Sequence, residues 1–331
     1  MTTTTSTPTH EPSQSRPAKP TIGQRLDDVL FGPEAPARLL AVQALFLVLI
    51  SVRTILSPYP KLAGAPVGLF KATYIVGWLD AMPSREVIIA VQVLIVTSAT
   101  AWFAIGRNPQ WRAPIRRATY AIAWFSFLFL AALRGSRGKI FHIELLLVWA
   151  SFPFVFAPSD ARWSDRTPRR RYGWPIRTAI GVTSAIYCLT GIWKLRNSGF
   201  DWVFSDNMKW SLAWGRVRGE RPPLGDVGVW LADHLWMTQV FAAFILAFEI
   251  TFPLVLFFKR VRPVYVVAAW CFHLGTLLLL GLDYTVWPVT VTILLISWPA
   301  LSDHFERWRT HHEVRPTAGK PVLARRSPGA T

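Results

Sequence analysis

The chain has 331 residues, of which 52% are hydrophobic, 14% aromatic and only 17% charged, and it contains 17 Trp, a composition too apolar for an ordinary soluble domain of this length. A formal net charge of +17 would suit either nucleic acid or anionic lipid as a partner. The Lys and Arg residues lie between the apolar blocks, which favours the lipid bilayer and argues against nucleic acid.

The two ends of the chain are predicted to lie outside the membrane. Residues 1–24 are polar and lack the apolar core of a secretory signal, so we expect a disordered cytoplasmic tail. Residues 304–331 are basic and show no pattern that would build a folded domain, so we expect a cytoplasmic tail suited to contact with anionic lipid. Residues 25–303 remain as the predicted transmembrane domain.

Apolar blocks within residues 25–303 predict an all-α, polytopic membrane helix bundle. A bilayer core of about 30 Å needs about 20 mostly apolar residues per helix, and about eight blocks of this kind separate the charge clusters. Their approximate bounds are 38–57, 86–106, 118–134, 140–157, 176–195, 231–258, 263–281 and 284–300. The third and fourth blocks are the least well separated.

The distribution of Lys and Arg predicts that both termini are cytoplasmic. Cations in short loops are retained on the cytoplasmic side of a membrane. With the N-terminus inside, the cytoplasmic segments contain more than twice as many Lys and Arg residues as the outer segments. We therefore expect a multi-pass protein of the inner (cytoplasmic) membrane, N-in and C-in.

Two predicted outer segments, 58–85 and 197–230, are long and rich in Trp, Pro and Gly. Trp favours the level of the lipid headgroups, so we expect these segments to cover the helix ends as caps or re-entrant pieces. Loops of more than about 12 residues are often functional.

Lys194 is the first candidate for chemistry, because an ionisable side chain inside a membrane span is costly and needs a reason. It closes the fifth block and shares a helical stripe with Tyr187 and Gly191, which would direct it inward if that stripe faces the bundle. A lysine desolvated there becomes a usable base or nucleophile near neutral pH. The alternative is a lysine that snorkels to the headgroups at a helix end.

His142 and Glu144 open the fourth block on the same predicted side as Lys194. They are two residues apart and therefore point to different faces of a helix. His142 is a candidate acid, base or hydrogen-bond donor, whereas Glu144 is expected to pair with Arg134, Arg137 or Lys139. The alternative for His142 is an interfacial side chain with a polar partner.

His273 and Glu249 lie deeper in the predicted spans. A neutral His near the midplane usually forms a hydrogen bond with another helix, and this is the structural alternative to a catalytic role for His273. Glu249 precedes Pro253 by four residues. We expect it to be structural: paired with Arg53, bound to the backbone loosened by the proline, or protonated.

The sequence contains none of the phosphate-binding, dinucleotide-binding, zinc-protease or nucleophile-elbow motifs of soluble enzymes. His311 and His312 lie in the basic tail and are only a weak metal signal. We therefore expect no metal site.

Three strings, YCLTGIWKLRNSGFDWV, AFEITFPLVLFF and CFHLGTLLLLG, occur in this order. In this respect the chain resembles the HTTM family, the membrane domain shared by vitamin K-dependent γ-glutamyl carboxylase and many bacterial proteins. The similarity covers most of residues 25–305 and is strongest over 183–283. The resemblance implies that Lys194 matches the base that starts vitamin K hydroquinone oxidation, that His142 lies near the family's catalytic His, and that His273 matches its Phe-His position.

The chain also departs from the carboxylase pattern. The carboxylase has paired lysines where this chain has Trp193 and Lys194, and it continues into a large extramembrane region that binds its protein substrate. This chain ends soon after the eighth block. Carboxylation of glutamate in a protein substrate is therefore not expected.

Two hypotheses follow. The first is a membrane enzyme, related to the vitamin K-dependent carboxylase and epoxidase, in which Lys194 acts as base on a reduced quinone such as menaquinol or a vitamin K hydroquinone-like lipid, and His142 stabilises developing negative charge. The second is a non-enzymatic partner or maturation and export factor for a membrane or exported protein, similar to an HTTM protein that assists a bacterial toxin. A transporter would show an internal repeat, and we see none that is convincing.

Overall fold

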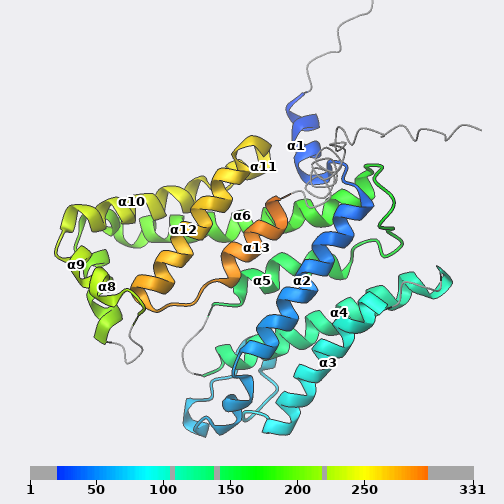
Figure 1. The fold of residues 1–331 in the computed structure, drawn as a ribbon, viewed down its shortest axis with the longest axis horizontal. Coiled ribbons are helices and arrows are strands. Elements are labelled where there is room, and N and C mark those ends of the chain that lie inside the picture. Colours follow the sequence, from blue (N-terminus) through cyan, green and yellow to red (C-terminus); the bar gives the residue numbers. More distant parts are fainter. Residues whose placement is uncertain (1–20, 105–108, 138–141, 218–221, 297–331) are drawn as a thin grey trace, which may run out of the picture.

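The computed structural model describes residues 21–104, 109–137, 142–217 and 222–296, which form helices with a single isolated β-bridge between Glu34 and Arg169 (Figure 1). The predicted all-α class is confirmed for these residues. Most of the predicted tails, 1–24 and 304–331, lies outside the described part of the chain. The described part of the chain begins with an amphipathic helix, α1 (Ile22–Phe31), which has a capping box formed by Thr21 and Gln24.

Five helices in the described part are long and apolar enough to cross a membrane. They are α2 (Pro36–Leu56), α3 (Arg85–Ala104), Ala113–Gly135 of α4 (Pro109–Gly135), α6 (Arg170–Ser198) and Lys259–Leu280, which includes α12 (Arg262–Leu280). A sixth span results if α9 (Gly225–Ala232) and α10 (Leu235–Thr251), which are bent by 106°, are taken together. The chain is thus a multi-pass membrane protein.

The fourth and eighth predicted blocks form shorter helices than a full span requires. The block 140–157 contains only α5 (Leu145–Ser151) and the 3-10 turn η4 (Phe152–Val155). Pro153 stops the α-helix there, because it lacks the N–H that would continue the α-helical hydrogen bonds, and the chain goes on as a 3-10 turn. The block 284–300 contains α13 (Val286–Leu295), and residues beyond 296 lie outside the described chain.

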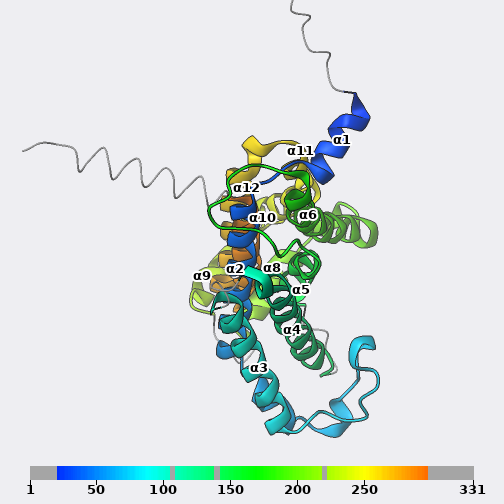
Figure 2. The ribbon, with the colours of Figure 1, turned by 90° about the vertical axis from the view of Figure 1, so that its right-hand side faces the viewer.

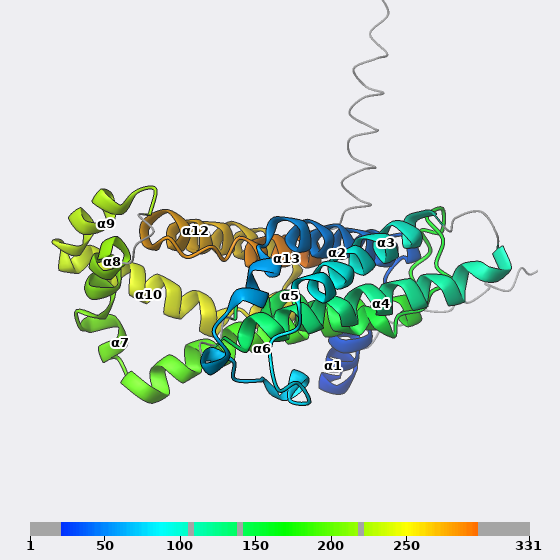
Figure 3. The same ribbon diagram turned by 90° about the horizontal axis from the view of Figure 1, so that it is seen from below.

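The helices pack in two layers. Figure 3 shows α12, α13, α2 and α3 side by side in one layer, with α10, α6, α5 and α4 beneath them. Phe46, Trp102, Tyr120, Phe127 and Phe154 are among the largest fully buried side chains between these helices. The predicted helices therefore form one bundle with a continuous apolar core.

Buried ion pairs mark the two ends of this bundle. At one end, which we call the Glu34 end, Glu34 binds Arg38 at 2.6 Å and Arg177 at 3.0 Å. At the other, the Glu144 end, Glu144 Oε1 accepts hydrogen bonds from Arg134 Nη1 at 2.6 Å and Arg53 Nη2 at 3.2 Å. The first set ties α2 to α6, and the second ties the end of α2 to the end of α4.

The expected partner of Glu144 is confirmed in Arg134, but the expected pair between Arg53 and Glu249 is wrong. Arg53 instead binds Glu144 and, at 3.3 Å, Asp283. Partial burial raises the pKa of Asp283, but hydrogen bonds from Thr285 and the nearby Arg53 outweigh this effect, so the pKa lies below its usual value. Asp283 therefore stays ionised and completes the charge balance at this end.

The two long segments that were expected to cap the helices both lie at the Glu144 end. The first contains three short 3-10 turns, η1 (Tyr59–Gly64), η2 (Val67–Leu69) and η3 (Tyr74–Val76). The second contains α7 (Asp201–Phe204), α8 (Asn207–Val217) and α9, beside the ends of α10 and α12 (Figure 1). These helices expose Trp210, Trp214 and Trp230.

We predict that Glu144→Gln lowers the free energy of unfolding by about 3 kcal/mol, because two partly buried arginines lose the buried carboxylate that they share. Unfolding of the detergent-solubilised protein, followed by circular dichroism, measures this effect. Asp27→Asn is the control: its partner Arg170 is exposed, and an exposed pair contributes about 0–1 kcal/mol. Equal losses in the two variants would contradict the assigned role of Glu144.

Candidate functional site

A cavity of about 390 Å³ lies towards the Glu144 end of the bundle, between α6, α10, α12 and the segments that precede α5 and α13. All three residues that the sequence singled out contribute to it. The polar and aromatic side chains that line it include His142, Lys194, Glu249, His273, Tyr284 and Trp287. The cavity thus brings acidic and basic side chains together with aromatic rings.

Lys194 lies in the last turn but one of α6 and is held by Glu249 of α10. Its Nζ donates to both carboxylate oxygens of Glu249 at 2.7 Å, and it lies 4.5 Å from the ring centroid of Trp202. The side chain of Glu249 is only 3% exposed, and that of Lys194 is 21% exposed. Lys194 therefore turns into the cavity and does not extend towards the headgroups.

Gly191 allows α6 and α10 to approach closely enough for this pair to form. A Cβ at this position would lie 2.8 Å from Ile250 Cγ1 and 3.1 Å from Glu249 Cβ. The predicted stripe of Tyr187, Gly191 and Lys194 does face the bundle, since Tyr187 and Gly191 are both buried. The spacing of these three residues therefore sets the direction in which the lysine points.

His273 projects from α12 and binds α6. Its Nε2 lies 2.9 Å from the hydroxyl of Tyr187, and the ring of Tyr187 stacks on Phe252 at 4.4 Å. The predicted hydrogen bond to another helix is confirmed. Within the described residues the Nδ1 of His273 is buried without a hydrogen-bond partner.

His142 lies at the exposed mouth of the cavity, just before α5. Its Nε2 is 3.1 Å from the hydroxyl of Tyr284, whose ring also lies 6.1 Å from that of His273. His142 and Glu144 point in different directions, as their spacing predicted: His142 into the cavity and Glu144 into the ion-pair cluster with Arg53. Tyr284 connects the two histidines across the cavity.

From the sequence, Glu249 was expected to have a purely structural role, but its side chain lines the cavity. The block 231–258 was expected to be one span, with Glu249 about nine residues from its cytoplasmic end. In the structure α10 ends at Thr251, and Glu249, in its last turn, lies beside Lys194 of α6. The available signal was that an acid and a base in neighbouring spans favour each other as partners in an apolar medium.

This arrangement supports proton transfer with little net charge. The ammonium of Lys194 and the carboxylate of Glu249 neutralise each other, which reduces the cost of placing both in the bilayer. A ligand hydroxyl in the cavity could exchange a proton with this pair and accept or donate a hydrogen bond at His142 or His273. Phe272, Tyr284 and Trp287 offer ring faces to an apolar or aromatic ligand.

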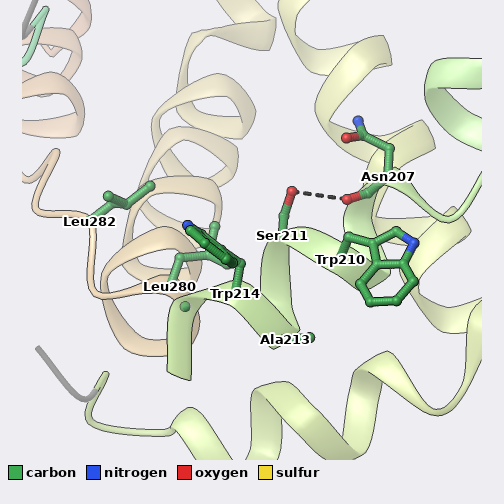
Figure 4. A pocket seen from close by; sticks show the side chains of 8 residues that line it. Asn207, Trp210, Ser211, Ala213, Trp214, Leu280 and Leu282 are labelled. Carbon is green, nitrogen blue, oxygen red and sulfur yellow. Dashed lines mark hydrogen bonds between the residues drawn. The ribbon is translucent and has the colours of Figure 1, made fainter. Parts of the chain in front are cut away.

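A larger hollow of about 560 Å³ lies over α8 (Figure 4). Trp210 and Trp214 line it together with Leu280, and the hydroxyl of Ser211 is bound to the backbone oxygen of Asn207 at 2.9 Å. None of the described residues that line this hollow has an ionisable side chain. It therefore lacks the groups for acid–base chemistry that the Lys194 cavity has.

Within the described residues, no group of three or more His, Cys, Asp and Glu side chains is placed to hold a metal ion. Comparison of the chain with protein-family models, with curated proteins and with solved structures finds no match.

We predict that the Lys194–Glu249 pair is strongly coupled in stability. Lys194→Met alone leaves a buried carboxylate unpaired and is expected to cost about 3 kcal/mol, whereas addition of Glu249→Leu should recover part of this loss. Unfolding of the four proteins of the double-mutant cycle gives the coupling energy. The same cycle for the exposed pair Arg171 and Asp160 should give less than about 1 kcal/mol; similar coupling in both cycles would refute the assignment.

Proposed function

We propose that this chain is an HTTM-type enzyme of the inner membrane that acts on a lipid-soluble quinol, with Lys194 as the base. The observation that carries the proposal is the convergence of Lys194, His142 and His273 on one cavity. These residues come from segments far apart in the sequence, and the HTTM resemblance singled out the same three positions. In the proposed topology, with about eight passes and both termini in the cytoplasm, the cavity lies towards the outer leaflet.

The proposed chemistry begins with transfer of a proton from the quinol hydroxyl. In its resting pair Lys194 is an ammonium bound to Glu249 and cannot accept a proton. Transfer of the ammonium proton to Glu249 gives a neutral amine and a carboxylic acid, a form that an apolar site stabilises relative to water. The amine then takes the quinol proton, and Glu249 retains the first proton.

His142 and His273 are proposed to stabilise the quinolate. The negative charge develops on the quinol oxygen as the proton leaves, and imidazole N–H groups aimed at that oxygen lower the barrier. His273, which lines the cavity, is proposed to supply one such contact. His142, at the mouth, offers the second and is oriented by Tyr284.

An apolar groove beside the cavity supports a lipid-soluble substrate. It has a volume of about 110 Å³ between α8, α10 and α12 and shares Phe272 and Thr276 with the cavity. Its other lining side chains, such as Phe241, Phe244 and Leu279, are almost all apolar. A substrate with a polar ring and a hydrocarbon tail would fit this arrangement, with the ring in the polar cavity and the tail in the apolar groove.

The second candidate is a non-enzymatic membrane partner or maturation and export factor. It is favoured by the exposed Trp210, Trp214 and Trp230 on the segment that caps the Glu144 end, and by the exposed Trp236 at the start of α10. Exposed aromatic groups of this kind suit a protein interface as well as headgroups. This function requires these tryptophans and does not require the Lys194–Glu249 pair to change its protonation.

The two candidates are separated by quinol oxidation in nanodiscs. The purified protein, supplied with menaquinol or vitamin K hydroquinone in air, is expected to form quinone, and Lys194→Ala should reduce the rate by about 10²-fold or more. Lys61→Ala, which removes an exposed lysine at the same end, is the control. Absence of quinone formation, together with an unchanged phenotype of Lys194→Ala in cells, would reject the enzyme.

A further inference from the structure

The Glu34 end of the bundle contains more buried positive than negative charge. Arg38, Arg177 and Arg262 are each 5–6% exposed, and Glu34 is the carboxylate that binds Arg38 and Arg177. Arg262 lies close enough to Arg38, Arg177 and Glu34 to interact electrostatically with each of them. Three guanidinium groups therefore share one buried carboxylate.

These arginines are not saturated by the protein. Arg38 also donates to the backbone oxygen of Leu294, and Arg262 to that of Val255. Within the described residues, however, Arg38 Nε, Arg177 Nε and Arg262 Nη2 are buried without a hydrogen-bond partner. Buried N–H groups of a charged side chain are costly to leave unpaired. The site is therefore suited to a further hydrogen-bond acceptor that carries negative charge.

A cavity of about 680 Å³ gives access to this charge. It lies between α1 and the segment formed by α11 (Leu254–Phe257) and η5 (Lys259–Val261), which are close together in Figures 1 and 2. Arg177 and Lys259 contribute cations to its wall. Asp28 also lines it, but its carboxylate is paired with Arg170 at 3.3 Å.

Exposed apolar side chains surround the cavity, as expected for a site at the level of the lipid headgroups. Phe257 and Phe258 line it and are more than half exposed, and α1 presents Ile22, Leu26 and Leu30 to the exterior. An amphipathic helix with such a face lies in the plane of the membrane interface. The cations of the cavity are thereby placed at the level of lipid phosphates.

We propose that this cavity is a binding site for the phosphate of an anionic phospholipid, with Arg177 and Lys259 as ligands and the acyl chains against Phe257 and Phe258. A phosphate supplies several charged oxygens, which match the forked donors of arginine. Basic pockets between transmembrane helices at the cytoplasmic side bind anionic headgroups by this chemistry. The site is separate from the Lys194 cavity and does not depend on the function proposed for it.

The full-length protein is tested in nanodiscs of phosphatidylcholine alone and of phosphatidylcholine with phosphatidylglycerol. Native mass spectrometry is expected to show a retained phosphatidylglycerol, and the thermal midpoint should rise in the anionic nanodiscs. Lys259→Gln should weaken retention about fivefold. Arg260→Gln is the matched control: it removes the same charge from the adjacent residue, which does not line the cavity, and should behave as the unaltered protein.

Equal retention of phosphatidylglycerol by the Lys259→Gln and Arg260→Gln proteins would overturn the site, as would equal midpoints in the two kinds of nanodisc. Arg177→Gln is a second variant, expected to lose retention where it remains folded. Inorganic phosphate, added to the protein in phosphatidylcholine nanodiscs, should not reproduce the rise in midpoint. If it does, the lipid assignment is rejected in favour of a soluble phosphate.

Discussion

A charge within a membrane bundle is stable only when an opposite charge or a set of hydrogen bonds accompanies it, and this constraint organises the present fold. Glu34 joins α2 to α6, Glu144 joins α2 to α4, and Glu249 joins α10 to α6. Each of these carboxylates pairs with at least one arginine or lysine on another helix. The ion pairs therefore fix the relative positions of helices whose apolar faces alone would allow sliding.

The same constraint explains why the Lys194 cavity can be both stable and reactive. A free lysine at this depth would be expelled towards the headgroups or lose its proton, whereas the pair with Glu249 retains it in place. The pair is neutral as a whole in either proton arrangement, so moving a proton between its members adds no net charge to the apolar site. A polar ligand that competes for one of the two hydrogen bonds between Lys194 and Glu249 would shift the proton from one side chain to the other.

The sequence predicts individual groups better than it predicts the pairs they form. Lys194, His142 and His273 stand out because ionisable groups are rare in apolar blocks, and the stripe through Tyr187 and Gly191 correctly indicates the direction of Lys194. Glu249 was not assigned to the site because hydropathy shows neither that α10 ends at Thr251 nor which helix its last turn faces. The shortness of α5 was missed for a related reason: Pro153 ends the α-helix within a block that remains apolar.

The two ends of the bundle differ in their charge balance, and this difference bears on orientation. At the Glu144 end, Arg53 and Arg134 face two carboxylates, Glu144 and Asp283, so the cluster is internally neutral. At the Glu34 end, three buried arginines lie near Glu34, the one buried carboxylate there among the described residues, and each has a guanidinium nitrogen without a hydrogen-bond partner among these residues. Anionic phospholipids of the cytoplasmic leaflet can supply negatively charged acceptors for these nitrogens. The unpaired guanidinium nitrogens at the Glu34 end thus favour the proposed topology, which places this end in the cytoplasm and was inferred from the loop cations.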